Sequence, residues 1–253
     1  MKRFLRDVFV VFELHAFRML RSRRALVMLL LSAVPALLLF VAFRVSARQS
    51  PEELVQVITW FLSFMFVVPF VALIGGSAVV AEEIADRTIT YVFTRPASRI
   101  AFLLGRWAAA MLVVGLVLIA GSLLLRLAAG SRDVPRVMWS VTLTTSVLGG
   151  LVYCTLFTAF SARFRHPMVV GVGYVFAFET MVANLPGNIS APSLQHQLRV
   201  WVLQRAAGEW RDVAELADLT DVADADPVRV LVGVLVVSLA AACLIIRRRE
   251  YVT

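Results

Sequence analysis

Long apolar runs without charge are the feature that most constrains this chain. A helix needs about 20 mostly apolar residues to cross roughly 30 Å of hydrocarbon. The 253 residues are 60% hydrophobic and only 17% charged, whereas a soluble domain carries about a quarter charged residues. The sequence therefore predicts an all-α integral membrane protein with one transmembrane domain over residues 1–253 and six transmembrane helices. The spans are expected at residues 25–43, 57–81, 102–125, 137–161, 168–186 and 228–246.

Basic residues that flank the spans orient the chain. Lys and Arg concentrate in cytoplasmic segments, and an N-terminus inside places sixteen of the twenty-five basic residues there. We therefore predict a multi-pass protein of the cytoplasmic (inner) membrane with both termini in the cytoplasm. Residues 187–227 become an extracytoplasmic segment. Within it, Leu194, Leu198, Trp201 and Val202 form an apolar stripe that predicts a short helix on, or dipping into, the outer leaflet.

Residues 1–24 are expected to form an N-terminal interfacial helix. Its basic residues are suited to lipid head groups. A short helix that packs on the rest of the chain explains the same pattern equally well. A cleaved signal peptide is disfavoured, because the first apolar run is long for such a segment. The residues expected on the apolar side are Leu5, Val8, Phe9, Phe12, Ala16 and Met19.

The residue inventory excludes several kinds of chemistry. The only Lys is Lys2, so the chain lacks the internal Lys that a phosphate-binding loop for ATP requires. Cys154 and Cys243 lie inside apolar runs, and the three His are widely spaced. We therefore predict no catalytic residue, no metal site and no cofactor bound by this chain.

The connection between the second and third predicted spans is unusually elaborate. As a helix it places Glu83 and Arg87 as a favourable i,i+4 pair on one face. Pro96 cannot continue that helix, and Ser98 is suited to cap the next one. The pattern predicts a short amphipathic helix on the cytoplasmic face between the two spans.

The same segment carries a family resemblance. The run E-I-A-D-R-T-I-T-Y-V-F-T-R-P-A-S-R, followed by L-L-G-R, resembles the segment after the second span in the type-2 family of ABC transporter permeases. That family reads approximately E-x-x-x-G-T-(I/L)-x-x-(L/V)-x-(T/S)-x-P-x-x-R, then G-(K/R). Arg87 departs from the pattern, because the family often has Gly there. The matching residues are Glu83, Thr88, Ile89, Val92, Thr94, Pro96, Arg99, Gly105 and Arg106.

The resemblance implies a function and a set of partners. The chain would be the membrane-spanning permease subunit of an ATP-driven exporter, paired with a second permease as a homo- or heterodimer. Two copies of a separately encoded ATPase would supply ATP and Mg. Membrane lipid is a further expected partner, and nucleic acid is not. The ATPase-coupling residues implied by the resemblance are Glu83, Asp86, Arg87, Thr88, Tyr91, Arg95 and Pro96.

Glu179 lies inside the fifth predicted span, eleven residues from its start. A carboxylate at that depth is unfavourable and marks a functional candidate. It either faces a substrate path or dimer seam, or makes a structural polar contact with a neighbouring helix. The alternative function is a secondary transporter or channel that uses Glu179. Against that alternative, the two three-span halves show no evident repeat. An intramembrane enzyme is disfavoured because the spans lack a G-x-S-x-G or H-E-x-x-H motif.

Overall fold

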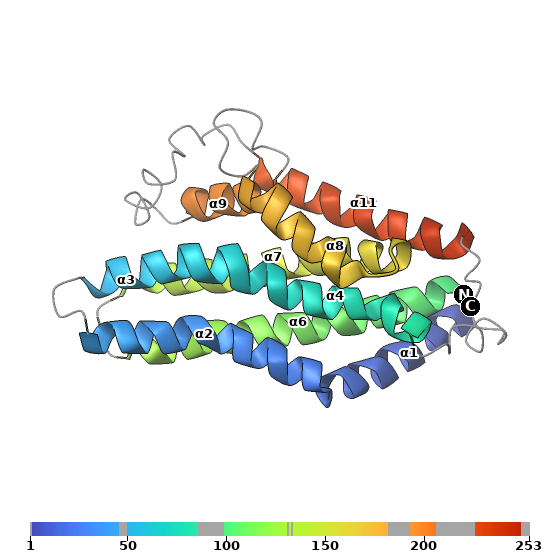
Figure 1. Cartoon of the computed structure of the whole chain (residues 1–253), viewed down its shortest axis with the longest axis horizontal. Helices are drawn as coiled ribbons and strands as arrows, with labels where there is room; N and C mark the ends of the chain where they lie inside the picture. The colour runs from blue at the N-terminus through green and yellow to red at the C-terminus, as the bar shows by residue number, and fades with distance from the viewer. Residues whose placement is uncertain are drawn as a thin grey trace.

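The computed structural model describes residues 2–45, 50–85, 99–130, 132, 134–181, 193–205 and 226–248. Within these ranges the chain is helical and contains no strand. The long helices run side by side along the longest axis of the molecule (Figure 1). Helices satisfy their backbone hydrogen bonds internally, which is the requirement that hydrocarbon imposes on a spanning segment.

Five of the described helical segments are long and apolar enough to cross a membrane, which confirms an all-helical, multi-pass membrane protein. The second of them is continuous through α3 (Pro51–Val57), the π-helix η1 (Ile58–Val67) and the first part of α4 (Val68–Ala85). The five segments are α2 (Arg23–Val45), Pro51–Ala81, α6 (Arg99–Ala129), α7 (Arg136–Arg163) and α11 (Pro227–Arg248).

The fifth predicted span, residues 168–186, is only partly covered by the described residues. α8 (Pro167–Gly173) continues directly into a second π-helix, η2 (Tyr174–Thr180), and the described helix ends at Met181. Residues 182–192 lie outside the described part of the chain, so the six-span count stays a prediction. The next described helix is α9 (Leu194–Arg205).

The bundle has two distinct ends. The first turns of α1 (Lys2–Leu20) and the last turns of α11 lie at one end (Figure 1), here called the inner end. The opposite end, where α2 finishes and α3 begins, is the outer end. The core is built around α4, α6 and α7 and includes Val71, Val114 and Phe157, which are fully buried.

Helix α1 packs along the inner half of α6. Ala16 and Met19 are buried, as the predicted apolar side requires, but Leu5 and Phe9 are 60% and 62% exposed. The helix has apolar residues on more than one side: Val8 and Val11 lie against Gly105 of α6, and Met19 lies against Gly75 of α4. The rest of the described chain leaves Leu5 and Phe9 uncovered, and the contact of this side of α1 with lipid stays a prediction.

Candidate functional site

The predicted ATPase-coupling residues lie outside the part of the chain that the structure describes. Residues 86–98 are not described, and neither is the side chain of Glu83. What the structure describes is the pair of helices that this segment joins: α4, which ends at Ala85, and α6, which begins at Arg99. The residues concerned are Glu83, Asp86, Arg87, Thr88, Tyr91, Arg95 and Pro96.

Gly105 is the point at which α1 crosses α6. A Cβ atom built on Gly105 would lie 2.7 Å from the backbone oxygen of Val8 and 2.8 Å from Cβ of Val11. Contacts this short require one of the two helices to move, and the nearest atom belongs to backbone. Glycine at this position therefore permits the close approach of α1.

Arg106, the next residue, joins α6 to α4. Its side chain is 3% exposed, and its Nη2 donates a hydrogen bond to the backbone oxygen of Ala78 at 3.4 Å. The guanidinium also lies over the ring of Phe102, 5.2 Å from the centroid. Gly105 and Arg106 thus bring α1, α6 and α4 together near the start of α6.

His15 of α1 is buried in this same junction. Burial is the largest cause that lowers its pKa, and the positive charges of Arg106, Arg18 and Arg24 lower it further, to about 3. The imidazole is therefore neutral at physiological pH. The side chain packs as an uncharged group against α6.

Glu179 lies in η2 and is completely buried. Its Oε1 accepts hydrogen bonds from Oη of Tyr174 at 2.6 Å and from the backbone N–H of Leu194 at 3.3 Å. Its Oε2 accepts from Oγ of Ser193 at 2.7 Å and from the backbone N–H of Gln195 at 2.9 Å. Four donors therefore converge on one carboxylate, which compensates the desolvation that makes such a group unfavourable in an apolar interior.

These contacts make Glu179 part of the N-terminal cap of α9. The first N–H groups of a helix have no partner inside the helix, and two of them, from Leu194 and Gln195, donate to Glu179. Oγ of Ser193 accepts from the N–H of His196 at 3.3 Å. A negative charge at this position is also favoured by the helix dipole. Glu179 consequently ties η2 to α9.

Gln195 extends the same network to η1. Its backbone N–H donates to Glu179, and its Nε2 donates to the backbone oxygen of Met65 at 3.0 Å. One residue of α9 thus bridges the two π-helices. π-helical segments interrupt the regular hydrogen-bond ladder and occur frequently at functional sites.

α9 lies deep against the spans. A Cβ built on Gly149, at the midpoint of α7, would lie 2.7 Å from Cδ1 of Leu198. The guanidinium of Arg199 lies 5.8 Å from the ring centroid of Trp60 in η1. Leu194, Leu198 and Val202, three residues of the predicted apolar stripe, are buried. α9 therefore packs against α7 and α11, and it reaches η1 through Gln195 and Arg199.

Comparison with known protein families decides what kind of protein carries this arrangement. The model of the family described as ABC-2 family transporter protein matches residues 18–183, about two-thirds of the chain. The chain belongs to the ABC-2 transporter family. A comparison with curated proteins finds no match. Family membership makes the chain a membrane permease component of an ABC transporter, and it implies an ATPase partner.

The match places the described junctions within the ABC-2 region. α4, α6, Gly105, Arg106 and Glu179 all lie inside residues 18–183. α9 and α11 follow it. The carboxylate of Glu179 thus belongs to the matched region, whereas the helix that it caps lies beyond it.

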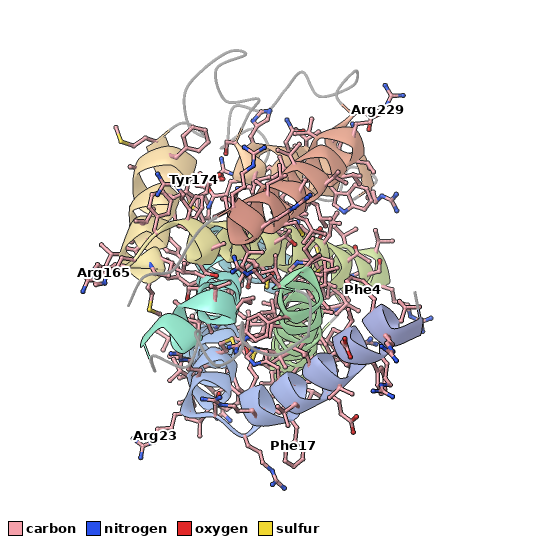
Figure 2. The ribbon with its side chains drawn as sticks, turned by 90° about the vertical axis from the view of Figure 1, so that its right-hand side faces the viewer. Phe4, Phe17, Arg23, Arg165, Tyr174 and Arg229 are labelled. Atoms are coloured by element: carbon pink, nitrogen blue, oxygen red, sulfur yellow. The ribbon has the colours of Figure 1, made fainter. Side chains whose placement is uncertain are left out.

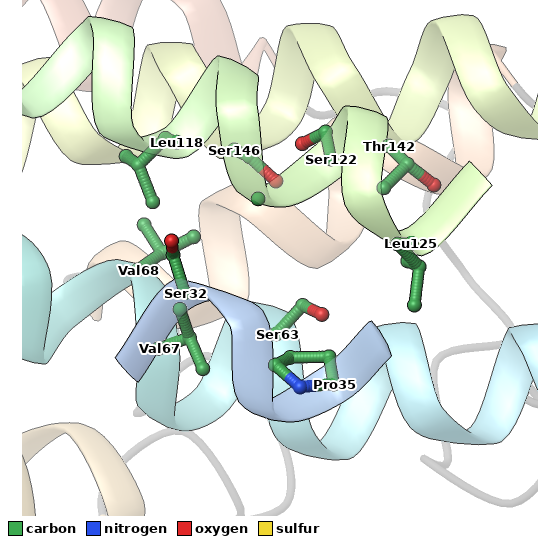
Figure 3. Close-up of a pocket in the computed structure, with 11 residues that line it drawn as sticks. Ser32, Pro35, Ser63, Val67, Val68, Leu118, Ser122, Leu125, Thr142 and Ser146 are labelled. Atoms are coloured by element: carbon green, nitrogen blue, oxygen red, sulfur yellow. The ribbon is translucent and has the colours of Figure 1, made fainter. Parts of the chain in front are cut away.

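A small cavity among α2, η1, α6 and α7 is a further polar feature of this ABC-2 chain (Figure 3). Five of its lining residues carry hydroxyls: Ser32, Ser63, Ser122, Thr142 and Ser146. Its volume is ≈ 20 Å³, which is room for about one water molecule. The cavity is therefore too small to hold a transported solute in this conformation.

Sequence reasoning identified Glu179 but missed its partners. Tyr174, Ser193 and Gln195 are not in the sequence-based site list, although the structure brings all three to Glu179. Ser193 had a signal, because a Ser that immediately precedes an apolar helical stripe is a typical N-cap. The two π-helices and the contact from Gln195 to Met65 have no comparable sequence signature.

Proposed function

We propose that this chain is the permease subunit of an ATP-driven exporter, and that it dimerises and binds two copies of a separate ATPase. The ATPase would contact residues 83–96 on the cytoplasmic face, and would itself bind ATP and Mg. ABC-2 family membership and the resemblance of residues 83–106 to the coupling segment of that family support the proposal. Both termini would then be cytoplasmic, in the inner membrane.

The observation that carries the proposal is the junction around Arg106. The segment that would receive the ATPase joins α4 to α6. Those helices are held together by the hydrogen bond from Arg106 to Ala78, and α1 is held by the close approach at Gly105. A displacement of the segment would therefore move three helices as a unit. Rigid-body motion of packed helices is a known means of transmitting a local change.

The alternative, a secondary transporter, would use Glu179 as its coupling carboxylate. Such a group must exchange protons or ions with water in at least one state. Here both carboxylate oxygens are buried and accept four hydrogen bonds from within the protein. This geometry favours a structural role for Glu179 and, with family membership, favours the ATP-driven transporter.

The test combines ATP hydrolysis with charge reversal. The purified chain alone is expected to hydrolyse no ATP, because it has no internal Lys. Glu83→Lys and Arg87→Glu, tested singly, should reduce copurification with the ATPase encoded beside the gene, or uncouple hydrolysis from transport, while membrane insertion stays normal. Arg126→Glu and Arg136→Glu, exposed at the outer end, are the matched controls. Unchanged assembly and transport in both Glu83→Lys and Arg87→Glu would contradict the proposal.

A further inference from the structure

A groove at the inner end of the bundle has both an apolar wall and a cationic rim. It lies between the start of α2, the last turns of α4 and the start of α8, and has a volume of ≈ 480 Å³. This is within the range of about 300–1,000 Å³ that is typical of ligand sites. We call it the inner groove.

The wall of the inner groove is apolar and elongated along the helices. Val27 contributes from α2, Ile74 and Ala81 from α4, and Met168 and Val169 from the start of α8. Ile74 and Ala81 are seven residues apart in α4, about 10 Å at 1.5 Å per residue. The apolar surface therefore extends from the inner end into the depth of the bundle.

The rim of the inner groove is basic. Arg23 and Arg165 are exposed and come from opposite sides of the groove, and Arg24 and His166 also line it. Figure 2 shows Arg23 and Arg165 on the same flank of the molecule. Among the lining residues that the structure describes, none is acidic. A ligand that fits must therefore combine an anionic group at the rim with an apolar part below it.

We propose that the inner groove binds one anionic phospholipid, with its phosphate at Arg23 and Arg165 and an acyl chain along Val27, Ile74 and Val169. A phospholipid places its charge at the membrane interface and its acyl chains in the hydrocarbon. The inner groove has the same arrangement, with a basic rim and an apolar wall below it. Arginine near the interface reaches head groups readily, with its own methylene groups on apolar surface. A soluble anion would use the rim but leave the wall exposed to water, and an acidic protein segment would not enter the hydrocarbon depth.

The charge at the rim predicts selectivity for the head group. Basic residues near a membrane surface attract anionic lipid by about 1 kcal/mol each, which is about fivefold in affinity per residue. Loss of both Arg23 and Arg165 should therefore weaken binding of phosphatidylglycerol about 25-fold. Binding of phosphatidylcholine with the same acyl chains should change little, because its head group carries no net charge.

The experiment titrates the two lipids onto the full chain, purified with its ATPase where the two copurify, and counts bound lipids by native mass spectrometry. The variants are Arg23→Gln/Arg165→Gln and the charge-conserving Arg23→Lys/Arg165→Lys. The matched control is Arg126→Gln/Arg136→Gln, which removes two exposed arginines from the outer end. Glycerol 3-phosphate is added as a chain-free competitor. We expect the Gln pair to lose phosphatidylglycerol selectively, and the Lys pair and the control to retain it.

Several outcomes would overturn the assignment. Retention of phosphatidylglycerol by the Gln pair within twofold of the unsubstituted chain would exclude a role for the rim. An equal loss of phosphatidylglycerol from the Arg126→Gln/Arg136→Gln control would mean that the net charge of the protein, and not the inner groove, determines lipid binding. Displacement of the lipid by glycerol 3-phosphate at equal concentration would make the site one for soluble anions. Loss of the ATPase from the Gln pair, with lipid retention unchanged, would assign the rim to a protein partner.

Discussion

The inner and outer halves of the bundle join their helices by different means. At the inner end, α1, α6 and α4 meet at adjacent residues of α6, where Gly105 allows close packing and Arg106 donates a hydrogen bond to Ala78 of α4. In the outer half, η2, α9 and η1 meet through a network centred on Glu179 and Gln195. Close packing at Gly105 is sensitive to added side-chain volume. The network around Glu179 and Gln195 is instead sensitive to the loss of a hydrogen-bond partner in a buried site. Substitutions should therefore affect the two regions for different reasons.

The largest expected effect comes from Glu179→Leu. This change leaves two backbone N–H groups of α9 and two hydroxyls without their acceptor in a buried site. Breaking a buried charged contact in this way costs about 3–5 kcal/mol. We expect a marked fall in the thermal unfolding midpoint of the detergent-solubilised protein.

Two further variants sharpen the test of Glu179. Glu179→Gln keeps one acceptor oxygen but turns an amide N–H toward the remaining donors, so an intermediate loss is expected. Glu13→Leu removes an exposed carboxylate from α1, and its effect should stay within about 0.5 kcal/mol. An unchanged midpoint for Glu179→Leu would mean that the outer network contributes nothing to stability.

A smaller effect is expected at the inner end from Gly105→Ala. The added Cβ meets backbone of α1 at 2.7 Å, and overpacking of this kind costs about 1–3 kcal/mol. Gly115→Ala is the matched control on the same helix, because a Cβ built there has no neighbour within 4 Å. It should be neutral or slightly stabilising, since Ala is the better helix former. Equal midpoints for the two variants would show that α1 does not depend on the close approach at Gly105.

The smallest expected effect is a dependence of stability on pH from His15. Its pKa is lowered from 6.5 to about 3 in the folded chain, so the unfolded chain binds the proton more tightly. Stability should then be unaffected above about pH 6.5 and should fall as the pH drops below it, by about 1–2 kcal/mol at pH 5. Thermal midpoints between pH 5 and pH 8 measure this slope.

Two His variants test whether His15 causes the dependence of stability on pH. His15→Leu should remove most of it. His196→Leu, at a partly buried position in α9, should leave most of it in place. A slope that persists in His15→Leu would assign the acid sensitivity to groups outside the α1–α6 junction.

The contrast between the two regions also explains what the sequence could predict. Five spans follow from apolar runs such as residues 25–43, because span length and hydrophobicity are properties of consecutive residues. Gly105 and Arg106 belong to the short L-L-G-R run that resembles the family pattern, so the sequence marked both residues as candidates. It did not predict which helices they would bring together. Glu179 was identified for a different reason, because it is a carboxylate inside an apolar run.

The partners of Glu179 could not be predicted in the same way. Ser193 and Gln195 lie beyond residues 182–192 in the chain, and their approach to Glu179 depends on how α9 packs against α7.

The position of α8 and η2 in the chain bears on the order in which the protein assembles during synthesis. Its apolar neighbours α4 and α7 precede it in the chain, so they are already made when residues 167–181 leave the ribosome. The donors for Glu179 on Ser193 and Gln195 follow fourteen and sixteen residues later. The nascent segment thus meets its apolar contacts first, and its carboxylate gains its full set of hydrogen bonds only after α9 has emerged.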